Sequence, residues 1–88
     1  MRVHVVSYDL NTPGQNYPAV VSVLESMGAQ RILYPQWMLR SALTAEQLRD
    51  QLLPYVDRND GLLVVDVTNA PMAWRGLRVQ IKAAFSLA

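Results

Sequence analysis

Asp9 is the residue of this chain with the clearest potential for chemistry. It ends an apolar run that begins at Val3, and turn residues follow it at positions 11–14, Asn-Thr-Pro-Gly. The β-branched valines predict a strand, and apolar side chains on both of its faces predict that the strand is central. Asp9 would then lie at the carboxyl end of a central strand, where open α/β sheets tend to place ligands. The alternative is that Asp9 caps the turn by accepting hydrogen bonds from its backbone N–H groups.

Four arginines could bind a polyanion such as nucleic acid. Contacts to phosphate groups give binding that is independent of base sequence and sensitive to salt. The alternative is that each arginine is a solvated surface residue whose aliphatic stem packs on the protein. Arg75 stands out because it lies between Trp74 and Gly76. The four are Arg31, Arg40, Arg75 and Arg78.

The tryptophans and the histidine add further candidates. Trp37 and Trp74 could stack on bases, but a tryptophan in a small chain more often lies in the core or at an interface. We expect Trp37 at an interface. His4 could act as a base, yet it lies near the far end of the first strand from Asp9, so the two should not work together. The sequence contains neither a Ser-His-Asp pattern nor a Gly-rich phosphate signature.

Length and composition indicate a single domain over residues 1–88. Apolar residues make up 51% of the chain, more than so small a domain can bury, so we expect an oligomer. Without cysteine and with one histidine, the chain cannot form disulfides or a Cys- or His-rich metal site. The net charge of +1 gives no broad case for nucleic-acid or membrane binding. No apolar run approaches the roughly 20 residues of a membrane span. Because Met1-Arg2 leads straight into the first strand without a signal-peptide layout, we expect a cytoplasmic protein.

Two helices are predicted from their caps and apolar spacing. The first begins near Asn16 and Pro18 and ends at Gly28, a typical residue just beyond a helix C-terminus. The second begins with a capping box, in which Thr44 caps the helix and Gln47 reaches back to it. Pro54 should end or kink this helix near its preceding residue. The apolar face of the first helix consists of Tyr17, Val20, Val21, Leu24 and Met27.

Three further strands are predicted between and after the helices. Residues 30–34 and 37–43 should form a hairpin, with Pro35 indicating an edge position or a bulge at its tip. Residues 62–67 form the most apolar run and predict another central strand. The tail from Leu77 fits both a helical and an alternating pattern. We favour a helix because positions 82–87 include good helix formers.

The element order is strand, helix, strand, strand, helix, strand. It predicts an α+β fold of ferredoxin-like βαββαβ type, with a four-stranded antiparallel sheet, both helices on one face and an additional C-terminal helix. We expect the first and last strands in the centre of the sheet. The face without helices needs a cover, and a second copy of the same sheet is the simplest one. The sequence therefore predicts a homodimer.

Three stretches of the chain resemble a known family. They are Val5-Val6-Ser7-Tyr8-Asp9-Leu10 with the Pro-Gly loop that follows, Leu48-Arg49-Asp50-Gln51-Leu52, and Asn59-Asp60-Gly61-Leu62-Leu63-Val64-Val65. The first is similar to the opening of the CRISPR-associated core protein that partners the integrase in spacer acquisition. All three together resemble more closely a stand-alone sub-branch of that superfamily. The resemblance spans about residues 1–67.

The resemblance implies a metal-dependent function for Asp9. In that family the aspartate after the tyrosine binds the metal, two copies face each other in a homodimer, and nuclease activity on RNA or DNA has been attributed to it. Asp9 would then be the catalytic residue and the ligand of a Mg²⁺ shared by two protomers. Arg31 falls where the family often has a basic residue opening the second strand. Arg31, Arg75 and Arg78 would contact nucleic acid, and an integrase-like protein would be a further partner.

Two functions therefore remain open at the level of sequence. One is a homodimeric nucleic-acid-binding protein or Mg²⁺-dependent endonuclease with Asp9 as metal ligand. The other is a non-catalytic dimer that acts as an adaptor for a protein partner. The loop at positions 11–16 bears on the choice, because a nuclease needs positive potential around Asp9 and this loop contains no Lys or Arg.

Overall fold

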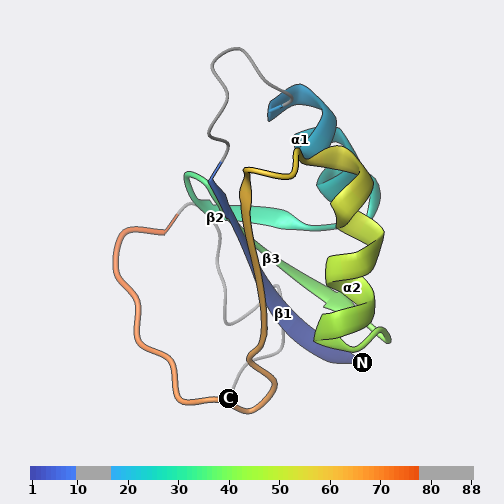
Figure 1. Ribbon diagram of the computed structural model, residues 1–88. Coiled ribbons are helices and arrows are strands. Elements are labelled where there is room, and N and C mark those ends of the chain that lie inside the picture. Colours follow the sequence, from blue (N-terminus) through green and yellow to red (C-terminus); the bar gives the residue numbers. More distant parts are fainter. Residues whose placement is uncertain (10–16, 78–88) are drawn as a thin grey trace.

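Four strands form one antiparallel sheet in the computed structural model, which describes residues 1–9 and 17–77 (Figure 1). Helices α1 and α2 both pack on one face of this sheet, which confirms the predicted ferredoxin-like α+β fold. A short 3-10 turn, η1, follows α2 directly. The elements in chain order are β1 (Arg2–Asp9), α1 (Tyr17–Ser26), β2 (Gln30–Leu33), β3 (Gln36–Ser41), α2 (Ala45–Leu52), η1 (Leu53–Tyr55) and β4 (Gly61–Asp66).

The strand order is β2-β3-β1-β4, so the expectation that the last strand is central was wrong. The hairpin sets β3 beside β2, and β3 also pairs with β1. The remaining side of β1 is then the place where β4 pairs. The apolar run of β4 reflects one buried and one exposed face: Leu62 and Val64 pack into the core, whereas Leu63 and Val65 are exposed. Hydrophobicity alone therefore misplaced this strand.

The end of α1 and the start of α2 lie where the local sequence predicts. Gly28 has a φ of 80°, and its N–H donates to the Glu25 carbonyl while the Ala29 N–H donates to the Leu24 carbonyl. These two bonds form a Schellman motif, which a residue with a Cβ would strain. At the start of α2, the Gln47 N–H donates to Thr44 Oγ1 and the Thr44 N–H donates to Gln47 Oε1. The predicted capping box is therefore present.

The β2–β3 hairpin has the predicted irregularity at its tip. A Tyr34–Pro35 turn with a cis peptide bond joins the strands, and the register shifts between Arg31 and Leu33. The predicted edge position of this hairpin strand is also confirmed, because β2 is the outer strand of the sheet. The helix predicted from Leu77 lies outside the described residues apart from Leu77 itself, as do Asn16 and Arg78. Within the described part of the chain, no helix is long and apolar enough to cross a membrane.

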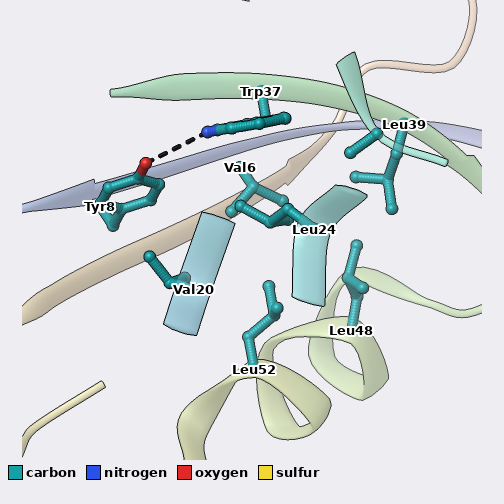
Figure 2. Packing of buried hydrophobic residues seen from close by; sticks show 9 residues of the cluster. Val6, Tyr8, Val20, Leu24, Trp37, Leu39, Leu48 and Leu52 are labelled. Carbon is teal, nitrogen blue, oxygen red and sulfur yellow. Dashed lines mark hydrogen bonds between the residues drawn. The ribbon is translucent and has the colours of Figure 1, made fainter. Parts of the chain in front are cut away.

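The main hydrophobic core lies between the sheet and the helices (Figure 2). Val6 and Tyr8 of β1 point toward α1 and α2, where Leu24 and Leu48 are fully buried. Trp37 is also part of this core, with 4% of its surface exposed, and its Nε1–H donates to the Tyr8 hydroxyl over 3.2 Å. The expectation that Trp37 lies at an interface was therefore wrong, since its own domain buries it.

The opposite face of the sheet is covered in part by residues 67–77, which we call the strap. Figure 1 shows this segment, in orange, leaving the end of β4 on the side of the sheet away from the helices. Met72 and Leu77 of the strap pack against a second buried cluster on the sheet. The expectation that this face has no cover from its own chain was therefore wrong in part. The buried members of the cluster are Val3, Ile32 and Met38, from β1, β2 and β3.

Candidate functional site at the uncovered corner of the sheet

Asp9 is the last residue of β1 and is exposed. Side chains alternate along a strand, and Tyr8 packs beneath the helices, so Asp9 faces the side that carries the strap. Its cross-strand partner is Gly61 on β4. Gly61 has no side chain to cover the carboxylate, and a Cβ there would lie 3.5 Å from the Asp9 Cβ. The flank of Asp9 toward β4 is therefore open.

Two exposed apolar side chains lie next to Asp9 on the same face. Ser7 pairs with Leu63 and Val5 pairs with Val65, so these residues form adjacent rows across β1 and β4. Leu63 is 58% exposed and Val65 is 41% exposed. We call Ser7, Asp9, Leu63 and Val65 the uncovered corner of the sheet. The corner combines one carboxylate, one hydroxyl and an apolar pair, which suits a protein surface or a hydrated cation more than a deep ligand pocket.

The corner supplies one carboxylate toward a metal ion. Within residues 1–9 and 17–77 there is no group of three or more His, Cys, Asp or Glu side chains that could hold a metal. Mg²⁺ is commonly held by one or two carboxylates and keeps several water ligands. Asp9 is an exposed carboxylate of the type that such a weakly held ion uses. The chemistry available to such an ion is to orient a water and neutralise a phosphate.

Arg31 lies on the other face of the sheet from Asp9. It pairs with Trp37 across the β2–β3 hairpin, and Trp37 belongs to the core beneath the helices. The Arg31 guanidinium carbon lies 4.8 Å from the centre of the Trp37 ring and 5.2 Å from that of Tyr34. The structure therefore does not bring Arg31 and Asp9 into one site.

The other predicted cationic residues lie on the strap and on β3. Arg75 is exposed on the strap beside Trp74, which is 41% exposed. Arg40 is exposed on β3 and pairs with Val3, at the end of β1 away from Asp9. Arg78 lies outside the described residues. Of the predicted phosphate contacts, Arg31, Arg40 and Arg75 thus lie on three different segments, β2, β3 and the strap.

His4 lies in the interior of the domain. It is fully buried on the helix side of β1, and its Nε2 lies 2.9 Å from the Leu43 carbonyl oxygen. This contact connects β1 to the residue before the Thr44 cap of α2. The expected separation of His4 and Asp9 is confirmed, because they occupy opposite ends and opposite faces of β1.

A polar cluster joins the start of the strap to β1, and sequence reasoning missed it. Arg2 Nε donates to Asp66 Oδ2 over 2.7 Å, and the Thr68 N–H donates to Asp66 Oδ1 over 2.9 Å. The Val3 N–H in turn donates to Thr68 Oγ1. Hydrogen bonds donated to Asp66 hold the pKa of its carboxyl well below the ordinary value. The bonds from Thr68 contribute most, and the bond from Arg2 comes next. The spacing Asp-x-Thr at the end of a strand was the available signal, since both residue types form local turns.

Comparison with protein-family models, with curated proteins and with solved structures finds no match to this chain.

Proposed function

We propose that this protein acts as a homodimeric, non-catalytic interaction module that assembles through the uncovered corner. The observation that carries the proposal is the exposure of Leu63 and Val65 side by side on the outer strand β4. Apolar side chains gathered beside an open strand edge are a common feature of association surfaces. Polar residues border them at one end, as at the rim of an interface.

The occupant of this corner is a second copy of the chain. A two-fold axis places the same patch of each copy against the other, so Leu63 and Val65 of one protomer meet apolar side chains of its partner. The net charge of +1 gives little repulsion between two copies. β4 also contains no Lys, Arg or Pro within Gly61–Val65 that would discourage a neighbour. A protein partner of the dimer, such as an integrase-like enzyme, would bind elsewhere on its surface.

Sedimentation velocity of the wild type and two matched variants tests this assignment. Leu63→Asp should convert a dimer to a monomer at micromolar concentration, because it places a charge in an apolar contact. Leu33→Asp is the control: Leu33 is 46% exposed, but it lies on β2 at the opposite edge. The control should remain dimeric. A monomeric wild type, or a Leu63→Asp variant that stays dimeric, would contradict the proposal.

A second candidate function is Mg²⁺-dependent cleavage of RNA or DNA at Asp9. It is supported by the exposure of this carboxylate in the same corner, where dimerisation through β4 would bring two copies of it to one interface. There the ion would lie between the protomers, and Asp9 of each would orient it. The resemblance of Ser7-Tyr8-Asp9 to the CRISPR-associated family also supports this function, and Arg75 and Arg78 are the proposed phosphate contacts.

Asp9→Asn distinguishes the two functions in a pair of assays. Asn keeps the shape of the side chain and a carbonyl acceptor, so the thermal midpoint should stay unchanged if Asp9 only ends the strand. Loss of the anionic oxygen should abolish Mg²⁺-dependent cleavage of mixed RNA and DNA substrates if Asp9 holds the ion. Glu25→Gln, an exposed carboxylate change on α1, is the control and should cleave normally. Cleavage that survives Asp9→Asn assigns the activity to another site or to a contaminant.

A further inference from the structure

The β2–β3 hairpin holds an arginine between two aromatic rings. Arg31 is half-buried, and its guanidinium lies over both Trp37 and Tyr34, at 4.8 Å and 5.2 Å from the ring centres. Trp37 is fixed from below, because it is buried in the core and its Nε1–H donates to the Tyr8 hydroxyl. Tyr34 is 60% exposed at the hairpin tip. The cation is therefore positioned by contacts with both rings before any ligand arrives.

Arg31 also lacks an anionic partner within the described residues. The ion pairs found there are made by Arg2 and Arg49. The Nε–H of Arg31 is buried and makes no hydrogen bond to a described residue. A half-buried guanidinium with an unsatisfied donor is costly unless an acceptor comes from outside the chain, because its hydration is only partly replaced by the rings. Oxyanions are the acceptors that a guanidinium binds most strongly.

We propose that the Arg31–Tyr34–Trp37 cluster binds the phosphate of a nucleotide, with the base against Tyr34. A planar guanidinium forms paired hydrogen bonds with phosphate oxygens, and its contacts with the two rings keep the Arg31 side chain in place. The exposed ring of Tyr34 offers a surface on which a base can stack. An inorganic anion would contact the Arg31 cation but not the Tyr34 ring. Comparing its affinity with that of a nucleotide therefore distinguishes the contribution of the cation from that of the ring.

This site is independent of the dimer and of Asp9. It lies on the edge strand β2 and on the helix side of the sheet, whereas Asp9, Leu63 and Val65 lie on β1 and β4 and face the strap side. Binding at Arg31 therefore requires neither a second copy nor a metal ion. A monomeric protein that cleaves nothing could still bind here, and a dimer could fail to.

The Arg31 Nε–H signal in ¹⁵N-correlated NMR spectra provides a direct readout. A buried Nε–H exchanges slowly with water, so its resonance should be visible without ligand. Thymidine monophosphate, inorganic phosphate and thymidine are titrated in low salt, followed by a short single-stranded oligothymidylate. We expect saturable shifts with the monophosphate, weaker binding of inorganic phosphate and no shift of the Nε–H signal with thymidine. Tighter binding of the oligonucleotide would identify a strand as the source of the phosphate.

Three variants test the roles of the side chains. Arg31→Lys keeps the charge but removes the planar fork, so thymidine monophosphate affinity, followed by backbone amide shifts, should fall by about tenfold, the loss of one charge-assisted hydrogen bond. Tyr34→Leu should reduce the affinity for thymidine monophosphate to that for inorganic phosphate. Arg58→Lys, an exposed arginine in the turn before β4, is the control and should bind as the wild type does.

The proposal is overturned if millimolar thymidine monophosphate leaves the Arg31 Nε–H signal unmoved, or if Arg31→Lys binds as tightly as the wild type. Equal affinities of thymidine monophosphate and inorganic phosphate in the wild type would contradict the proposed contact between the base and Tyr34. Backbone spectra of each variant show whether the fold is retained. If Arg31→Lys does not fold, the wild-type titration alone decides.

Discussion

The two faces of the sheet are completed by different strands. On the helix side, β1, β3 and β4 supply the core, and both helices close it. On the strap side, β1, β3 and β2 supply the core, and the strap covers it. Each outer strand therefore has one face that the described part of the domain buries only in part. On β4 that face carries Leu63 and Val65, whereas on β2 it carries Arg31 stacked on Trp37.

The two partly exposed faces differ in chemistry, and this difference assigns association to β4 and anion binding to β2 in the two proposals. The outer face of β4 carries the exposed apolar residues Leu63 and Val65, which suits association with another protein. The corresponding face of β2 is cationic and aromatic, and the strand is interrupted by a shift in register, which discourages edge pairing. Under the two proposals, the apolar edge of the sheet would contact a partner chain and the cationic edge would bind an anion.

The largest expected effect is the loss of a large side chain from the helix-side core. Leu24→Ala should lower the free energy of unfolding by about 2–5 kcal/mol, because Leu24 is fully buried between α1 and the sheet. Leu63→Ala on the opposite face should change it by less than about 0.5 kcal/mol at concentrations where the protein is monomeric. Urea denaturation of both variants measures the difference. Equal losses would mean that Leu63 is buried in the folded protomer.

A smaller effect is expected from the strap. Met72→Ala should cost about 1–2 kcal/mol, since Met72 is only half-buried but packs against the Val3–Ile32–Met38 cluster. Ala73→Ser, an exposed change in the next residue, should be neutral within about 0.5 kcal/mol. Chemical denaturation gives both values. A neutral Met72→Ala variant would show that the strap adds nothing to the fold in solution.

The smallest effect concerns how acid weakens the hydrogen bonds of Asp66 at the start of the strap. The pKa of Asp66 is lowered in the folded protein by Thr68 and Arg2, so the charged carboxylate stabilises the fold above its unfolded pKa of about 3.9. This contribution should diminish as pH falls below that value, because the unfolded chain takes up the proton first. Asp66→Asn should therefore flatten the decline in thermal midpoint between neutral and acid pH. Asp50→Asn on exposed α2 is the control, and an equal flattening there would exclude a specific role for Asp66.

Local sequence determined the elements of this protein and their ends. Gly28 and the pair Thr44 and Gln47 act on backbone groups only a few residues away, so their effects are visible in the chain itself. The hairpin around Pro35 and the exposed Asp9 at the end of β1 follow from equally local patterns. The order of the elements was then enough to predict the ferredoxin-like fold, because few topologies connect them with right-handed crossovers.

The tertiary structure alone decided which apolar residues are buried and which segments cover them. The run Leu62–Val65 is the same in an edge strand as in a central one, so only its pairing with β1 shows that Leu63 is exposed. Trp37 became a core residue because α1 and Tyr8 close over it, and the strap covers Met38 from residues more than thirty positions away. The stacking of Arg31 on Trp37 and the bond from Arg2 to Asp66 likewise join separate strands. The first contact depends on the register of the hairpin, and the second depends on strand order, because no short stretch of sequence contains both Arg2 and Asp66.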